Sequence, residues 1–391
     1  MTPKKLRIMF SSNAIWSPSG YAQQMQDLLP LIRDEGYPLA ISNFYGQEGG
    51  VFLLDGILQY PKMGHPWGSD AMVVHSQDFN ADVTITLQDI WVLDDNNIRE
   101  LKRFCPIVPV DHDPIPMGIF NKLKLAYKII TYSKFGFHQL EKLGTASTFI
   151  PHTVNTELFV NSNKKAEIRK TLGIPEDMFL FGMVAANKDN PSRKSFQEVL
   201  DAFKRFQDKY PNSGIYFHVL LQQQGGFPID TYANAIKIKN IYNTPPYTQL
   251  LKVSKADMVK IYNSIDCLLA PSTNGGFEVP LIEAGACEVP AITNDFTAMK
   301  DLVIEGVTGY KTKVAYKRYT HLQSYIGIPS VDSLYEKMEA VYATDRVKMG
   351  KEARKFVVEN FDLKTTFNTK WKFWLERTEK ELYPNLVEKL D

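Results

Sequence analysis

The sequence predicts an α/β protein made of two Rossmann-like domains that face each other across a central cleft. Short apolar segments alternate with amphipathic segments of helical period along most of the chain. Such alternation is typical of parallel sheets that are covered by helices. The 391 residues exceed the size at which a single hydrophobic core usually stops growing, so we expect two domains of ordinary size.

The first domain is expected to span residues 1–160. A buried strand over 6–11 leads into a helix over 20–35, within which Pro30 predicts a kink or a break. The stretch 46–68 is rich in glycine and aromatic residues, and no periodicity assigns it to an element. The further strands expected here are 39–44, 83–87, 107–110, 128–132 and 147–150, with helices over 96–104 and 134–143.

The second domain is expected to span residues 161–362 and to repeat the alternation. Residues 363–391 then carry large apolar side chains at helical spacing, which predicts a terminal helix within 363–390 that ends before Pro384 and packs back on the first domain. The strands expected in the second domain are 179–184, 214–221, 267–270 and 291–293, and the helices are 195–210, 255–264 and 280–287.

The composition narrows the classes of function. Lys and Arg number 45 against 44 Asp and Glu, which gives a net charge of +1. A protein that coats long nucleic acid is usually more basic, so bulk charge does not indicate that partner, although local basic patches stay open. The three cysteines, Cys105, Cys267 and Cys287, form no CxxC pair, so neither a disulfide framework nor a zinc site is predicted. We expect neither a metal nor a bound cofactor.

The chain shows no targeting or membrane-spanning pattern. The apolar stretch near the N-terminus is too short for a secretory signal, and no window approaches the roughly 18 apolar residues of a spanning helix. A cytoplasmic location is therefore expected. Residues 122–134 mix basic and aromatic side chains, so a peripheral membrane contact stays open beside the simpler interpretation of a helix end followed by a buried strand.

Two segments of the first domain carry candidate functional residues. Gly20 opens the first helix, where backbone N–H groups can approach an anion, although a Ser-capped helix start explains the same pattern. This loop is not GxGxxG, so the dinucleotide fingerprint is absent. Asp111, His112 and Asp113 directly follow a strand. A His between two carboxylates can donate to a hydroxyl while Asp holds its orientation, and an ordinary Asp-Pro turn is the alternative.

In the second domain, a polar loop follows the strand over 179–184. Asn187 and Lys188 begin this loop, and Arg193 and Lys194 end it at the start of a helix. We expect the three basic side chains to converge at the carboxyl end of the strand. Arg binds phosphate oxygens through two hydrogen bonds and Lys acts as a point charge, so the loop predicts a pyrophosphate site. A solvated basic loop is the alternative.

The most specific pattern is the run PSTNGGFEVPLIEAGAC over residues 271–287. A strand leads into a glycine turn, and a helix begins near Pro280, a favoured first helical position. The N–H groups of the turn and the helix dipole can stabilise phosphate charge. Glu283 is expected on the first turn of this helix, where its carboxylate can accept two hydroxyls of a ribose. Alternatively, Glu283 interacts only with the helix dipole.

At these residues the chain resembles the family 4 retaining glycosyltransferases, which have the GT-B fold. The likeness is strongest over 179–305 and is clear again at 110–113 and 149–159. It implies transfer of a sugar from a nucleotide diphosphate sugar with retained anomeric configuration. The favoured course is metal-independent attack on the same face, with the leaving phosphate helping to deprotonate the acceptor.

The resemblance also implies roles for single residues. Glu283 would bind the ribose, Lys194 with Lys188 or Arg193 would hold the diphosphate, and His112 would contact the donor sugar. The backbone near 251–255 would read the base. The residues implied as catalytic are Asp111, His112, Arg193 and Lys194, and those implied as donor-binding are Gly20, Asn187, Lys188, Val253, Gly275, Gly276, Phe277, Glu278, Val279 and Glu283.

The donor loop departs from the family pattern at two positions. Gly275 stands where the family usually has the first of two Glu, and Glu278 stands where it usually has Gly. The missing carboxylate normally touches the donor sugar, and Glu278 could reach the same hydroxyls from a different Cα. A nucleotide-sugar-binding module without turnover, a GT-B sugar-nucleotide epimerase and DNA as the acceptor stay open as alternatives. No pattern specifies the donor base and sugar, the acceptor, which we place mostly within 46–80, or the oligomeric state.

Overall fold

The computed structural model describes residues 5–250 and 253–384, and the chain divides into two compact units. Unit 1 comprises Met1–Val110, Ile115–Thr153 and Leu363–Asp391, and unit 2 comprises Asp111–Pro114 and Val154–Asp362. The chain enters unit 2 after Thr153 rather than after residue 160, because Val154 N donates to the Phe361 carbonyl at 3.0 Å. Residues 111–114 belong to unit 2 because Asp113 N donates to the Tyr325 carbonyl at 3.1 Å.

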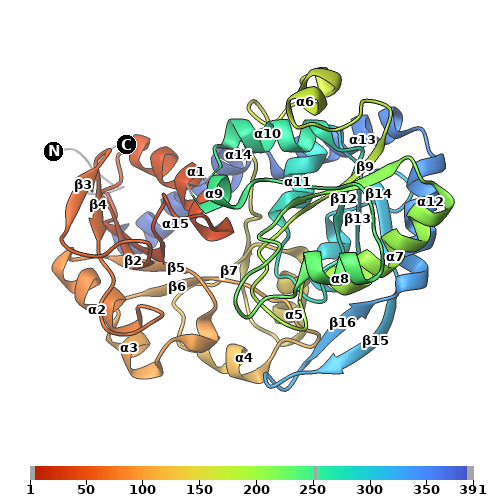
Figure 1. The fold of residues 1–391 in the computed structure, drawn as a ribbon. Coiled ribbons are helices and arrows are strands. Elements are labelled where there is room, and N and C mark those ends of the chain that lie inside the picture. Colours follow the sequence, from red (N-terminus) through yellow and green to blue (C-terminus); the bar gives the residue numbers. More distant parts are fainter. Residues whose placement is uncertain (1–4, 251–252, 385–391) are drawn as a thin grey trace. The chain divides into compact units, whose positions relative to one another are not determined.

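Unit 1 is built on a sheet with the strand order β3-β4-β2-β1-β5-β6-β7-β8 (Figure 1). Neighbouring strands are parallel except β3 and β4, which form an antiparallel hairpin at the edge. The strands are β1 (Ile8–Asn13), β2 (Leu39–Tyr45), β3 (Phe52–Leu54), β4 (Ile57–Tyr60), β5 (Val83–Leu87), β6 (Phe104–Val108), β7 (Ile130–Thr131) and β8 (Thr148–Phe149). The helices between them are α1 (Gly20–Asp34), α2 (Ser69–Asp78), α3 (Asp95–Glu100), α4 (Met117–Leu123) and α5 (Lys134–Lys142).

In unit 1 the structure excludes a break of α1 at Pro30, shortens one expected helix and assigns the stretch that the sequence left open. Helix α1 runs through Pro30 without ending, because Leu28, Leu29 and Ile32 on both sides of it stay buried on one face. The helix expected over 96–104 ends at Glu100, since Phe104 already pairs with Thr84 as the first residue of β6. The unassigned stretch 46–68 contains the hairpin of β3 and β4, and β4 joins the sheet beside β2.

The C-terminal segment belongs to unit 1, as the sequence predicts. It consists of α14 (Leu363–Thr366), a π-helical turn (Phe367–Trp371) and α15 (Lys372–Leu382). Trp374 and Leu375 are buried, and Lys372 Nζ lies 2.8 Å from Glu35 Oε2 at the end of α1. The helix ends at Leu382, before Pro384, as predicted, and residues 385–391 lie outside the described residues.

Unit 2 contains a parallel sheet with the order β11-β10-β9-β12-β13-β14, and an antiparallel pair, β15 and β16. The strands are β9 (Phe179–Val184), β10 (Ser213–His218), β11 (Ile241–Asn243), β12 (Cys267–Ala270), β13 (Ala291–Asn294), β14 (Gly309–Thr312), β15 (Val314–Tyr319) and β16 (Tyr325–Pro329). The helices are α6 (Lys165–Thr171), α7 (Phe196–Lys209), α8 (Ile229–Ala235), α9 (Pro246–Leu250), α10 (Lys255–Ser264), α11 (Val279–Ala286), α12 (Val331–Ala343) and α13 (Arg346–Phe361).

Two apolar clusters cover the faces of the unit 2 sheet. Helices α7, α8 and α12 pack on one face around Phe181, Phe203 and Leu334, and α10, α11 and α13 pack on the other around Leu180 and Tyr262 (Figure 1). Both faces are therefore closed by helices, and the loops at the strand ends are left for function. Ligands bind at the carboxyl ends of strands in sheets of this kind.

Candidate functional site

The loop over 271–278 carries the candidate site of unit 2. Strand β12 ends at Ala270, the loop follows, and α11 begins at Val279 with Pro280 in its first turn. Ser272 and Thr273 are buried although they lie in a loop. The loop therefore brings backbone amides and the start of a helix to the carboxyl end of a strand, where an anion is stabilised.

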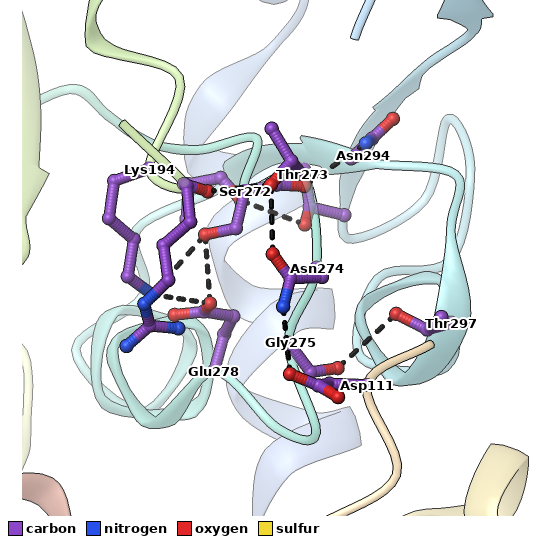
Figure 2. Close-up of polar contacts among 12 residues, drawn as sticks. Asp111, Lys194, Ser272, Thr273, Asn274, Gly275, Glu278, Asn294 and Thr297 are labelled. Atoms are coloured by element: carbon purple, nitrogen blue, oxygen red, sulfur yellow. Dashed lines mark hydrogen bonds and ion pairs between the residues drawn. The ribbon is translucent and has the colours of Figure 1, made fainter. Parts of the chain in front are cut away.

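Neighbouring elements hold this loop in one conformation (Figure 2). Asn294 Nδ2, at the end of β13, donates to the Ser272 carbonyl at 3.0 Å. Thr297 Oγ1 donates to the Gly275 carbonyl at 3.3 Å. Because these bonds come from the protein's own side chains, they restrict the conformations of the loop, and a preorganised loop lowers the entropic cost of binding.

Asp111 and His112 lie against the same loop. Asp111 Oδ1 lies 2.6 Å from His112 Nδ1, and Asp111 Oδ2 accepts from Asn274 Nδ2 at 2.7 Å. Burial acts to raise the pKa of Asp111, but the bonds from His112 and Asn274 and the charge of Arg193 outweigh it, so this pKa lies below its usual value. An ionised Asp111 only accepts hydrogen bonds, so His112 donates through Nδ1, and Nε2 is the ring atom left for a substrate.

Lys194 and Glu278 form a buried ion pair in the centre of this cluster (Figure 2). Lys194 Nζ lies 2.6 Å from Glu278 Oε1, which also accepts from Ser272 Oγ at 2.8 Å. Burial lowers the pKa of Lys194, and Glu278 opposes this effect without fully reversing it. The pair was not predicted from the sequence, because nothing in the spacing links the two residues.

The expected convergence of three basic side chains is only partly found. Lys194 is buried in the cluster, and Arg193 is close enough for its charge to act on Lys194 and Asp111. Lys188 is exposed, so the structure does not bring it into the buried cluster. Arg193 Nε lies 3.7 Å from Asp189 Oδ2 in the same loop, and both side chains are about half exposed. This part of the loop therefore presents both a negative charge, from Asp189, and a positive charge, from Arg193, to solvent.

Asn187 has a different role from the one expected for its side chain. It is fully buried, its Nδ2 donates to the carbonyls of Leu220 and Phe227, and its Oδ1 accepts from Phe227 N at 2.8 Å. The side chain thus ties its own loop to the loop after β10. We assign it a positioning role, since its amide atoms are occupied within the protein.

Glu283 lies on the second turn of α11 and not on the first, because the helix begins at Val279. Its Oε2 accepts from Tyr262 Oη at 2.6 Å, and both residues are buried. Burial and the charge of Glu283 hold the pKa of Tyr262 well above its usual value, so the phenol keeps its proton and donates. Tyr262, on α10, is a partner that sequence reasoning missed, because only the fold brings α10 to α11.

The remaining predicted donor-binding residues of unit 2 lie in this loop, at the start of α11 and just before α10. Gly276 and Phe277 precede the helix, and the Phe277 ring makes an edge contact with Phe361 at a centroid distance of 5.8 Å. Val279 is the first residue of α11. Val253 is half-buried just before α10, and the adjacent residues 251–252 of the base-reading stretch lie outside the described residues.

Gly20 lies in unit 1, where it is the first residue of α1. Ser19 caps this helix by accepting from Ala22 N at 3.1 Å, which confirms the Ser-capped helix start. A Cβ atom added to Gly20 would have no atom within 4 Å. The position of a side chain at Gly20 is therefore open space.

Unit 1 also has buried polar atoms without a hydrogen-bond partner at the carboxyl ends of β1 and β5. Asn13 is the last residue of β1, and Gln88 directly follows β5, the neighbour of β1 in the sheet. Among the described residues, Asn13 Oδ1 and both amide atoms of Gln88 have no hydrogen-bond partner. Polar residues directly after apolar strands are the sequence signal for this cluster, but no site was predicted there.

Within 5–250 and 253–384, no cluster of three His, Cys, Asp or Glu side chains is arranged to hold a metal ion. In the same part of the chain, no helix combines the length and the apolar character needed to cross a bilayer.

A family model described as "Glycosyl transferases group 1" matches residues 180–320, which include β9, the basic loop, β12 and α11. The capsular polysaccharide biosynthesis glycosyltransferase CapM of Staphylococcus aureus is 26% identical over 186 residues, which are 48% of this chain and 45% of that protein. The alpha-galactosylglucosyldiacylglycerol synthase of Streptococcus pneumoniae is 27% identical over 41% of this chain and 40% of that protein. The chain thus spans less than half the length of these curated relatives.

Solved structures match over nearly the whole chain. Sucrose-phosphate synthase from Thermosynechococcus elongatus has a TM-score of 0.74 at 14% identity and covers 95% of this chain and 99% of its own. Anabaena HepE in complex with UDP-glucose has a TM-score of 0.68 at 14% identity, over 96% of this chain and 100% of its own. These neighbours establish the GT-B fold. The family model and the two relatives show that part of this chain is similar to group 1 glycosyltransferases.

Proposed function

We propose that this chain is a retaining glycosyltransferase that moves a sugar from a nucleotide diphosphate sugar to an acceptor. The observation that carries the proposal is the buried Lys194 beside the amides that open α11, at the carboxyl end of β12. This arrangement is suited to hold a diphosphate whose negative charge grows as the bond to the sugar breaks. Solved structures of Anabaena HepE are complexes with UDP and with UDP-glucose.

The donor would be held by residues of unit 2. Lys194 and Arg193 would neutralise the diphosphate, and the loop amides before Val279 would donate to its oxygens. His112 Nε2, oriented by the Asp111 bond to Nδ1, would contact the donor sugar. Glu283, oriented by Tyr262, would accept from the ribose hydroxyls.

The bonds of Asp111 favour same-face attack over a double displacement through this residue. A carboxylate that must attack a sugar carbon needs a free oxygen with a clear approach. Asp111 has Oδ1 bound to His112 and Oδ2 bound to Asn274. We therefore assign the acceptor proton to the leaving phosphate as its base. Metal independence and a cytoplasmic location stay predictions.

The acceptor would bind in unit 1. Its class is not fixed, but the unpartnered amide of Gln88 and the carbonyl oxygen of the Asn13 side chain are suited to hydroxyl groups. This assignment moves the expected acceptor region from 46–80 to the carboxyl ends of β1 and β5.

Titration calorimetry with UDP, GDP and ADP, followed by NMR of each matching nucleotide sugar, tests the proposal. We expect one diphosphate to bind and its sugar donor to be hydrolysed slowly without an acceptor. Binding without any turnover across a broad acceptor screen would favour a nucleotide-sugar-binding module, which the replacement of the usual loop Glu by Gly275 makes the second candidate. Absence of binding to all three nucleotides would contradict the proposal.

A further inference from the structure

Gly275 faces the buried Lys194–Glu278 pair and leaves a space that no other residue type would leave. A Cβ atom at this position would lie 2.9 Å from Glu278 Oε1 and 3.4 Å from Met299 Sδ. Gly275 is absent from the residues with positive φ, so its backbone does not demand glycine. The requirement is therefore one of space, and the group that occupies the space is the Glu278 carboxylate.

That carboxylate is held on both sides by buried partners. Glu278 and Lys194 are 5% and 9% exposed, so neither charge is screened by bulk water. Glu278 Oε1 accepts from both Lys194 Nζ and Ser272 Oγ, and Lys194 Nζ lies 3.3 Å from Ser272 Oγ (Figure 2). The ammonium group is thus fixed by a triangle of contacts whose only negative member is Glu278.

We propose that Glu278 is a positioning residue that keeps Lys194 charged and aimed in the donor site, and that Gly275 is the residue that makes room for its carboxylate. This inference rests on the proposed function for its ligand, a nucleoside diphosphate. A diphosphate entering this site shares Lys194 with an existing carboxylate instead of meeting a lone cation. The protein then sets both the protonation state and the direction of the Lys194 ammonium group that contacts the diphosphate.

The charges around Lys194 give the proposal a pH signature. Burial lowers its pKa, Glu278 raises it, Arg193 lowers it and Asp189 raises it. Replacing Glu278 by Gln keeps an acceptor for Ser272 and removes the negative charge. Burial and Arg193 then act with less opposition, so Lys194 loses its proton at a lower pH than in the wild type.

The first test follows Lys194 directly in the full chain. Lysine labelled with ¹³C at Cε is titrated by NMR from about pH 6 to about pH 11, a range that brackets the usual lysine value of about 10.4. The resonance is assigned by its loss in Lys194→Arg. We expect Glu278→Gln to lower the midpoint by about one pH unit or more. An unchanged midpoint overturns the positioning role.

The second test measures binding of UDP across the same range by calorimetry. In Glu278→Gln we expect Kd to rise about tenfold over the interval in which Lys194 loses its proton, while the wild type still binds. A matched control is Glu339→Gln, which removes the carboxylate of the Lys209–Glu339 pair in the same unit, where Lys209 is exposed and Glu339 half-buried, and should change neither result. Parallel pH profiles for the wild type and Glu278→Gln would count against the proposal.

The role of Gly275 is tested by a double-mutant cycle. Gly275→Ala should displace the carboxylate and lower the Lys194 midpoint in the wild-type background, but should have little effect in the Glu278→Gly background, where no carboxylate is met. Equal shifts in both backgrounds would overturn the role of Gly275. A wild type that binds no nucleotide would end the proposed function and leave the NMR comparison valid, so the two failures are distinguishable.

Discussion

Replacing Lys194 should separate the stability of the buried ion pair from its part in binding. In Lys194→Met the side chain volume is largely kept, but Glu278 stays as a buried carboxylate without its cation. Both partners are less than a tenth exposed in the wild type. We therefore expect the free energy of unfolding to fall by about 3–5 kcal/mol, the usual cost of breaking a buried ion pair. At about 2–4 °C per kcal/mol for a domain of this size class, the unfolding midpoint of unit 2 should fall by roughly 6–20 °C.

The double variant Lys194→Met with Glu278→Gln removes both charges and keeps an acceptor for Ser272. Its thermal midpoint should return close to that of the wild type, since replacing a complete buried pair by neutral groups is often near neutral in free energy. Both variants should nevertheless lose transfer activity. A phosphate contact worth about 2–4 kcal/mol in the transition state corresponds to a fall in kcat/KM of roughly thirtyfold to nearly a thousandfold.

The assays are calorimetric unfolding of the full chain and initial rates with the donor that binds. A thermal midpoint for Lys194→Met equal to that of the wild type would refute the buried-pair argument, as would a double variant that is no more stable than the single one. Normal turnover in the double variant would refute the placement of Lys194 on the diphosphate.

Three further outcomes are expected. Glu283→Gln should weaken nucleotide binding, as measured by calorimetry. Tyr262→Phe should weaken it less, because only the hydroxyl that orients Glu283 is lost. Unchanged affinity of Glu283→Gln would contradict the ribose-binding role of Glu283. Gln88→Leu should raise the thermal midpoint, since a buried amide without partners costs about 1–3 kcal/mol of stability. The same variant should lower the transfer rate with any acceptor. A fall in both the thermal midpoint and the rate would point to a structural role of Gln88. Burial lowers the pKa of His152 to about 3. Below about pH 6.5 His152 binds a proton in the unfolded chain but not in the folded chain. The free energy of unfolding therefore falls as the pH is lowered from about 6.5 to about 3. His152→Phe should flatten this loss in melting curves taken across that range, and an equally steep loss would contradict the assignment.

Strands that are buried on both faces were predicted almost to the residue. The ranges 83–87, 179–184 and 267–270 coincide with β5, β9 and β12, because a buried parallel strand is a continuous apolar run. The helix over 255–264 coincides with α10, which Ser254 caps by accepting from Asp257 N. In each case the local signal and the tertiary environment demand the same element.

Elements whose form depends on a neighbour were not predicted. Strand β4 exists because it pairs with β2, and its sequence in the 46–68 stretch has no clear alternation. Helix α1 does not end at Pro30, because burial of its apolar face outweighs the lost backbone bond. Phe104 is drawn out of a helix and into β6 by pairing with Thr84.

The candidate site divides in the same way. The sequence alone predicted the glycine turn over 275–276, the helix start near Pro280 and the basic side chains after β9, because the residues that form turns and helix caps act locally. Only the tertiary structure decided that Lys194 meets Glu278 across 84 positions and that Asp111 meets Asn274 across 163. The carboxyl ends of strands distant in sequence come together at one edge of a sheet, and it is this edge, not the order of residues along the chain, that selects which charges become partners.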